Sequence, residues 1–180
     1  MPLLKEFLYG LTHSASRKIQ AWTAGIMTIG LAVTVGIALA FEHIGGYMPC
    51  KLCLEERIPY YIGIPVLAVA WIACMAKWPP VLTRGLILVG ALLMTIGLAL
   101  SIYHTGVELK YWPGPIDCSA ATMKITRDAG NLLNDLNTHP PACDSAPGYF
   151  LGLSFAGWNA VASLLFAAIS YYGAFAKSGK

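Results

Sequence analysis

A Cys-x-x-Cys motif, Cys50-Lys51-Leu52-Cys53, directly precedes a long apolar stretch. If a helix begins near Cys50, its free N–H groups and the positive end of its dipole stabilise a thiolate, the species that attacks disulfides. Arg57 follows Cys53 by four residues, so on a helix the two side chains share one face. The pattern predicts thiol–disulfide chemistry at Cys50 and Cys53, with Arg57 supplying a fixed positive charge beside them.

A second pair of cysteines, Cys118 and Cys143, is separated by 24 residues. Taken alone, the pair is best explained as a structural disulfide, which stabilises a fold by about 3 to 4 kcal/mol on a chain-entropy estimate. If it lies on the same side of the molecule as Cys50 and Cys53, the two dithiol pairs can exchange with each other. The sequence leaves both interpretations open, while Cys74, inside an apolar stretch, is interpreted as a small buried filler.

Four cysteines also raise the question of a metal site. Structural zinc sites take four Cys or His ligands, usually from two closely spaced pairs. Cys118 and Cys143 are too far apart in sequence to form a second such pair, so we expect no metal. A thioredoxin-like domain is excluded because no alternation of strands and helices surrounds the motif.

Other polar residues lie close to the apolar stretches. His104 is interpreted either as an interfacial residue or as a hydrogen-bonding group for a bound ligand. Glu55 and Glu56 are expected to be solvated acids at a helix start, where they suit the dipole. Trp158 and Asn159 are expected to serve packing and interhelical hydrogen bonding.

The elements that must hold these residues are four apolar stretches, in a chain of 180 residues that is 57% apolar and only 12% charged. Each is long enough to cross a hydrocarbon core as a helix, which takes roughly 20 residues. The predicted fold is all-α: one membrane domain over residues 1–180, a bundle of four transmembrane helices. The predicted helices are residues 21–41, 58–78, 85–103 and 149–175, with outer loops at residues 42–57 and 104–148.

The distribution of charge predicts the orientation. Basic residues concentrate at the N-terminus, in the connection near residues 77–84 and at the C-terminus, which are therefore predicted to be cytoplasmic. The two outer loops carry five basic against eight acidic residues and contain four of the five cysteines, as suits an oxidising compartment. Lipid is the expected surrounding, and no basic nucleic-acid footprint is visible.

The connections differ in what they predict. Lys77-Trp78-Pro79-Pro80 should end one helix sharply and begin a tight helical hairpin. Residues 120–136 have a weak apolar periodicity, which fits either a short helix on the membrane surface or a polar loop.

Several of these segments together resemble one protein family. They are Pro49-Cys50-Lys51-Leu52-Cys53-Leu54-Glu55-Glu56-Arg57, Tyr103-His104-Thr105, the pair Cys118 and Cys143, and Phe150-Leu151-Gly152-Leu153. The combination resembles the DsbB family of quinone-dependent disulfide bond formation proteins of the bacterial inner membrane, and its flanks look closest to the alphaproteobacterial branch.

The resemblance implies a four-helix bundle that binds ubiquinone or menaquinone near its outer face. Cys53 would form an adduct or charge-transfer complex with the quinone, Cys50 would be its partner, and Arg57 and His104 would lie beside the quinone. Cys118 would form the mixed disulfide with a periplasmic, thioredoxin-fold protein of the DsbA type, and Cys143 would be its partner in the loop.

The sequence therefore supports a relay hypothesis, in which electrons pass from a dithiol partner through two cysteine pairs to a quinone. One alternative is an enzyme like vitamin K epoxide reductase, but there the Cys-x-x-Cys normally lies late in the chain. The other is a membrane protein of structural role whose outer loops are only stapled by inert disulfides.

Overall fold

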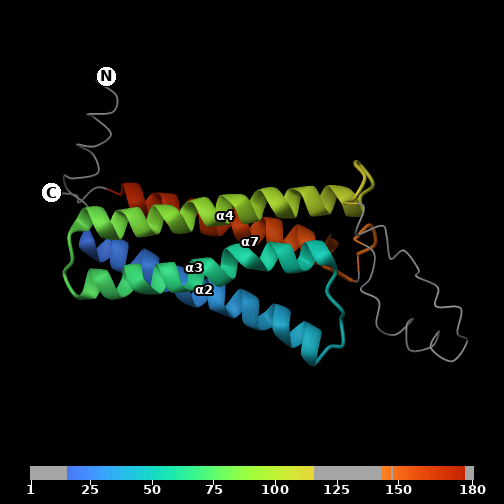
Figure 1. The fold of residues 1–180 in the computed structure, drawn as a ribbon, viewed down its shortest axis with the longest axis horizontal. Coiled ribbons are helices and arrows are strands. Elements are labelled where there is room, and N and C mark those ends of the chain that lie inside the picture. Colours follow the sequence, from blue (N-terminus) through green and yellow to red (C-terminus); the bar gives the residue numbers. More distant parts are fainter. Residues whose placement is uncertain (1–15, 116–142, 147, 177–180) are drawn as a thin grey trace, which may run out of the picture.

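The computed structural model describes residues 16–115, 143–146 and 148–176. In these residues four long helices form a bundle: α2 (Arg17–His43), α3 (Lys51–Met75), α4 (Pro80–Glu108) and α7 (Phe155–Phe175). All four run along the long axis of the molecule (Figure 1). Each is long and apolar enough to cross a membrane. The predicted all-α, four-helix membrane fold is thereby confirmed.

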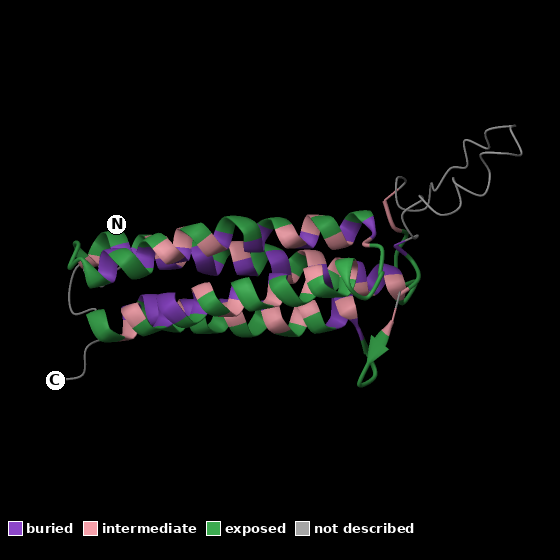
Figure 2. Ribbon diagram, turned by 90° about the horizontal axis from the view of Figure 1, so that it is seen from below, coloured by how far each residue is buried: buried purple, intermediate pink, exposed green. Residues whose placement is uncertain are grey.

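The outside of the bundle is apolar. In the most apolar 18-residue window of each helix, no more than 39% of the residues are buried, and the exposed positions cover the outer faces of the helices (Figure 2). Ile29, Ile72 and Leu92 are each more than half exposed. Such a surface suits hydrocarbon as its surrounding solvent.

Small residues bring the helices together, as is usual for helices packed in a membrane. The clearest case is Gly90 of α4, which faces Leu67 of α3. A Cβ added at Gly90 would lie 2.8 Å from Leu67 Cδ2. Close approach at such positions gives the bundle a continuous core that includes Met27, Leu31 and Met94.

Two lysines lie just beyond the misplaced C-terminal ends of α3 and α4. α3 ends at Met75 rather than at residue 78, and α4 runs from Pro80 to Glu108 rather than over residues 85–103. Lys77 and Lys110, just beyond the two helices, have φ values of 59° and 61°. Each closes a Schellman motif, for which glycine is the usual sequence signal, so neither end carried that signal.

The prediction of one helix over residues 149–175 was wrong for its first six residues. They form an antiparallel hairpin of β1 (Tyr149–Phe150) and β2 (Leu153–Ser154). Between the strands, Leu151 and Gly152 have φ values of 51° and 85°, which an α-helix does not allow. The Ser154 hydroxyl then accepts a hydrogen bond from the Gly157 N–H and caps α7.

The predicted outer loops were also too long. Residues 51–57 belong to α3 and residues 104–108 to α4, while α2 extends over residues 17–43 instead of 21–41. Arg84, assigned to a connection, is a buried residue of α4. The proposed surface helix at residues 120–136 lies outside the described residues.

Candidate active site

The candidate site lies at one end of the bundle, which we call the cysteine end. There the α2–α3 connection, the last turns of α4 and the hairpin before α7 come together (Figure 1). Cys50 is the N-cap of α3, so the motif lies at a helix start as the sequence predicted.

Cys50 and Cys53 form a close pair of free thiols. Their Sγ atoms are 2.8 Å apart, and the Cys53 N–H donates to Cys50 Sγ over 3.2 Å. The hydrogen bond from the Cys53 thiol is the main cause that lowers the pKa of Cys50, and it outweighs the opposing effect of burial. Cys50 is 5% exposed whereas Cys53 is only partly buried, so Cys53 is the more accessible sulfur.

His104 faces the same pair from α4. Its Nε2 lies 3.6 Å from Cys50 Sγ, and its Nδ1 lies 2.8 Å from Glu56 Oε1. The ring is 2% exposed. His104 was predicted to follow the third helix, but it lies within α4, which continues for another turn. Its proposed position beside a quinone stays a prediction.

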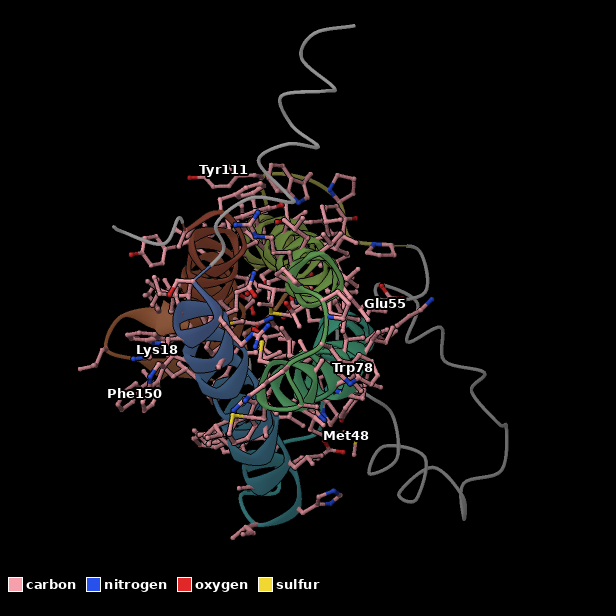
Figure 3. All side chains as sticks on the ribbon, turned by 90° about the vertical axis from the view of Figure 1, so that its left-hand side faces the viewer. Lys18, Met48, Glu55, Trp78, Tyr111 and Phe150 are labelled. Atoms are coloured by element: carbon pink, nitrogen blue, oxygen red, sulfur yellow. The ribbon has the colours of Figure 1, made fainter. Side chains whose placement is uncertain are left out.

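Glu56 is the residue that the sequence interpretation placed wrongly. It is not solvated but 6% exposed, and its Oε2 accepts a hydrogen bond of 2.7 Å from Asn159 Nδ2 of α7. Glu56 follows Cys53 by three residues, which is a same-face spacing on a helix, and this spacing was the missed signal. Glu55 instead lies at the periphery of the bundle (Figure 3).

Asn159 continues this buried network across the bundle. Its Nδ2 also donates to Ser101 Oγ, and its Oδ1 accepts a 2.7 Å hydrogen bond from Tyr60. Interhelical hydrogen bonding by Asn159 is thus confirmed. Trp158 packs against Phe150 and donates to its carbonyl oxygen. The network fixes Glu56, and Glu56 in turn fixes the orientation of the His104 ring.

Arg57 pairs with an acid on a different helix. Its guanidinium forms an ion pair with Glu42 of the last turn of α2, at 2.5 Å. The side chains are 14% and 24% exposed. This pair links α2 to α3 next to the Cys-x-x-Cys motif. The role of Arg57 beside a quinone is a prediction that the contact with Glu42 does not test.

Cys143 lies close to the first cysteine pair. It is disulfide-bonded and 2% exposed, and it packs in one buried cluster with Cys50, Leu52 and Val107. Cys53 packs against this cluster. Cys118, the predicted disulfide partner of Cys143, lies outside the described residues. A cavity also opens beside Cys143, lined among others by Lys110, Trp112 and Asp144.

The chain was compared with known protein families. The family model for disulfide bond formation protein DsbB matches residues 20–173. The chain belongs to the DsbB family. The match covers all four helices and both cysteine pairs, and it supports a role in disulfide bond formation.

Curated relatives named disulfide bond formation protein B agree with this assignment at modest identity. The protein of Pasteurella multocida is 28% identical over 156 residues, which are 84% of this chain and 82% of the relative. That of Histophilus somni is 26% identical over 144 residues, 79% and 78% of the two chains. That of Cupriavidus necator is 35% identical over 75 residues, 42% and 43% of the two chains. No solved structure matches.

Within this DsbB-family bundle the sequence interpretation also missed Glu108. Its carboxylate is buried in the last turn of α4, with Oε1 3.9 Å from His104 Nε2. Its Oε2 has no hydrogen-bond partner among the described residues. The sequence signal was the i, i+4 spacing from His104, which could be used only if α4 was known to continue past residue 103. Cys74, interpreted as a filler, is a buried free thiol far along α3 from this site.

Proposed function

We propose that this protein is a thiol:quinone oxidoreductase of the bacterial inner membrane. It reoxidises the dithiol of a periplasmic DsbA-like protein and passes the electrons to ubiquinone or menaquinone. The observation that carries the proposal is that Cys143 packs in one buried cluster with the free Cys50, against which the free Cys53 also packs. Membership of the DsbB family supports the same chemistry.

The relay begins at the loop pair. A partner thiolate attacks Cys118 of a Cys118–Cys143 disulfide, and the second partner thiol resolves the mixed disulfide, leaving the partner oxidised and the loop reduced. The Cys143 thiolate then attacks Cys50 of a Cys50–Cys53 disulfide and releases Cys53. Attack by Cys118 on Cys143 restores the loop disulfide. The two electrons and two protons then reside on Cys50 and Cys53.

Just before the electrons leave, Cys50 and Cys53 are proposed to be free thiols and the loop disulfide to be re-formed. The Cys50 and Cys53 sulfurs are hydrogen-bonded at 2.8 Å, so transfer of the Cys53 proton to Cys50 is proposed to generate the Cys53 thiolate. Cys53, as the more accessible sulfur, is proposed to meet the quinone.

The residues at this end of the bundle fit a quinone. Leu54 and Ile58, about half exposed beside Cys53, offer an apolar surface toward the membrane. Arg57 and His104 are proposed to lie beside the quinone carbonyls. Arg57 can donate to a carbonyl while it is paired with Glu42, since a guanidinium carries more N–H donors than one carboxylate can occupy. When bound, the quinone supplies the two-electron oxidising power that re-forms the Cys50–Cys53 disulfide.

Glu56 and His104 are proposed to handle the protons. Glu56 holds the Nδ1 side of the ring, so the Nε2 side faces Cys50. An imidazole so placed can take the thiol proton as the sulfur is oxidised, and the Glu56 carboxylate stabilises the resulting cation. The chain is proposed to function as a single domain with both termini in the cytoplasm, as the charge distribution predicts.

The proposal is tested by quinone reduction. The purified full-length protein in lipid nanodiscs is supplied with quinone and a reduced thioredoxin-fold dithiol protein, and the quinone absorbance is followed. Wild type and a Cys74→Ser control should reduce quinone at similar rates, while Cys53→Ser should be inactive. A Cys53→Ser protein that works at the wild-type rate would refute the proposal. A protein with merely stapled loops would reduce no quinone in any form.

A further inference from the structure

Two helices bring three metal-ligating side chains together at the cysteine end. The sulfurs of Cys50 and Cys53 and a ring nitrogen of His104 all lie within 4.8 Å of one another. We propose that the reduced form of this site binds one thiophilic divalent cation of the Zn²⁺ class, and that the bound metal reversibly holds the enzyme out of its cycle. This regulation rests on the proposed function, since it acts on the dithiol form of the same pair.

The distances suit such an ion. With Zn–S of about 2.3 Å and Zn–N of about 2.0 Å, tetrahedral geometry places S and N roughly 3.5 Å apart and two sulfurs roughly 3.8 Å apart. Cys50 Sγ and His104 Nε2 are 3.6 Å apart. The two sulfurs, at 2.8 Å, would have to separate by about 1 Å. Cys50 lies outside the helix at its N-cap, where such an adjustment leaves the helix bonds intact.

Glu56 prepares His104 for this role. Histidines that bind metals through one ring nitrogen almost always donate the other N–H to a carboxylate or carbonyl, which fixes the tautomer. His104 Nδ1 lies 2.8 Å from Glu56 Oε1, and Asn159 holds the second oxygen of the same carboxylate. The lone pair of His104 Nε2 is then directed toward Cys50.

Glu108 offers a further carboxylate oxygen at the same site. Its side chain is 3% exposed, and its Oε1 lies 3.9 Å from the same Nε2 that faces Cys50. Its Oε2 has no hydrogen-bond partner among the described residues. The carboxylate already has a hydrogen bond from the Ser154 side chain, so only Oε2 is left for a cation or its water to meet. A cation bound by Cys50, Cys53 and His104 would take the Glu108 carboxylate, or a water hydrogen-bonded to it, as its fourth ligand.

The sequence offered no reason to expect a metal, and the proposed ligand set differs from the one considered there. The question there was whether Cys118 and Cys143 complete a set with Cys50 and Cys53, and their spacing argued against this. The third ligand instead comes from α4, and the packing of α3 against α4 places it there.

Binding is confined to one redox state. The metal replaces the two thiol protons and requires no oxidant, whereas a Cys50–Cys53 disulfide offers no thiolate to bind it. A loaded site has no free sulfur for the quinone, so the Cys50–Cys53 disulfide that Cys143 attacks cannot re-form. Zinc outside the cytoplasm would therefore slow disulfide formation until a chelator or a competing ligand removes it.

Metal binding is measured directly, without quinone. The full-length protein is reduced with a phosphine that does not bind zinc and titrated with Zn²⁺ against a chromophoric chelator. We expect one ion per reduced chain and none for the oxidised protein. Co²⁺ serves as a second probe, since thiolate ligation gives it strong visible and near-ultraviolet bands.

Matched variants identify the ligands. Glu56→Gln should weaken binding about 10- to 100-fold, the usual effect of losing a carboxylate behind a ligating histidine. His104→Ala should weaken it further, while His43→Ala, an exposed histidine at the end of α2, should have no effect. Cys118→Ala/Cys143→Ala should retain the ion. If Glu56→Gln and His104→Ala bind like His43→Ala, or if the loop double variant loses the ion, the proposed site is wrong.

The inhibition is tested separately. Zn²⁺ should lower the rate of quinone reduction, and a chelator should restore it. A protein that binds Zn²⁺ but never reduces quinone would contradict the proposed function and leave the metal site standing. A protein that reduces quinone unaffected by Zn²⁺ would contradict the metal regulation alone.

Discussion

Replacing the buried Glu56 carboxylate tests how the site is held together. Glu56 accepts hydrogen bonds from Asn159 Nδ2 at 2.7 Å and, with the ring N–H on Nδ1, from His104 at 2.8 Å, and it is 6% exposed. Glu56→Ala removes the acceptor of the His104 Nδ1–H and of one of the two Asn159 Nδ2 N–H groups, while the other still donates to Ser101. Since each unsatisfied buried group costs about 1 to 3 kcal/mol, the variant should lose roughly 2 to 6 kcal/mol of stability.

Glu56→Gln is the more informative change, because it keeps the size of the side chain and removes its charge. A hydrogen bond to a charged group contributes about 1.5 to 3 kcal/mol. If this charge stabilises the imidazolium that forms as Cys50 loses its proton, its loss should slow the step roughly 10- to 150-fold.

The assay is single-turnover quinone reduction in nanodiscs, with the thermal unfolding midpoint measured in parallel. Glu55→Gln is the matched control, since Glu55 is the neighbouring acid at the periphery of the bundle (Figure 3). It should retain the wild-type rate and midpoint. If Glu56→Gln reduces quinone within twofold of Glu55→Gln, the role of Glu56 in proton transfer is refuted.

Three further predictions concern other parts of the site. The pKa of Cys50 is lowered below the ordinary value of 9.0, mainly by the Cys53 thiol, so its alkylation rate should stay high at pH values where a normal cysteine is protonated. Cys53→Ala should raise the pH at which alkylation of Cys50 reaches half of its maximal rate. Mass spectrometry of alkylated peptides measures this midpoint, and an unchanged midpoint would show that the Cys53 thiol is not the cause. Gly106→Ala should displace Trp112, because an added Cβ would lie 2.0 Å from its ring, and should destabilise the protein by about 1 to 3 kcal/mol; an unchanged tryptophan emission and melting point would contradict this. Arg57→Met should raise the KM for quinone, whereas Glu42→Gln should change it less; equal effects would mean that Arg57 acts only through its ion pair.

Much of the fold follows from the sequence because membrane helices leave a strong signal. A span needs about 20 apolar residues, and the four stretches could be recognised from composition alone. The C-terminal ends of the second and third helices were harder to predict, because Lys77 and Lys110 adopt the left-handed conformation that glycine usually marks. The hairpin at residues 149–154 was also not predicted, because its apolar residues resemble the start of a membrane-spanning helix.

The site was predictable where chemistry and spacing coincide in one segment. Cys50 and Cys53 were found this way, since the motif and the helix start are adjacent. The contacts of the pair with other helices were not: His104 and Asn159 were named, but their contacts with Cys50 and Glu56 were not foreseen, and Glu108 was missed. Glu56 was misread because an acid near a helix start is normally solvated, and the buried donors on α4 and α7 that reverse this preference cannot be read from a single sequence.

The central claim is that electrons pass between Cys143 and Cys50, which pack in one buried cluster. In a Cys53→Ser variant, Cys50 has no partner of its own, so its thiolate should attack Cys143 of the loop disulfide and release Cys118 as a thiol. Peptide mapping of the alkylated, unreduced protein should then find a Cys50–Cys143 disulfide and a blocked Cys118. Recovery of an intact Cys118–Cys143 disulfide with alkylated Cys50 would contradict the relay.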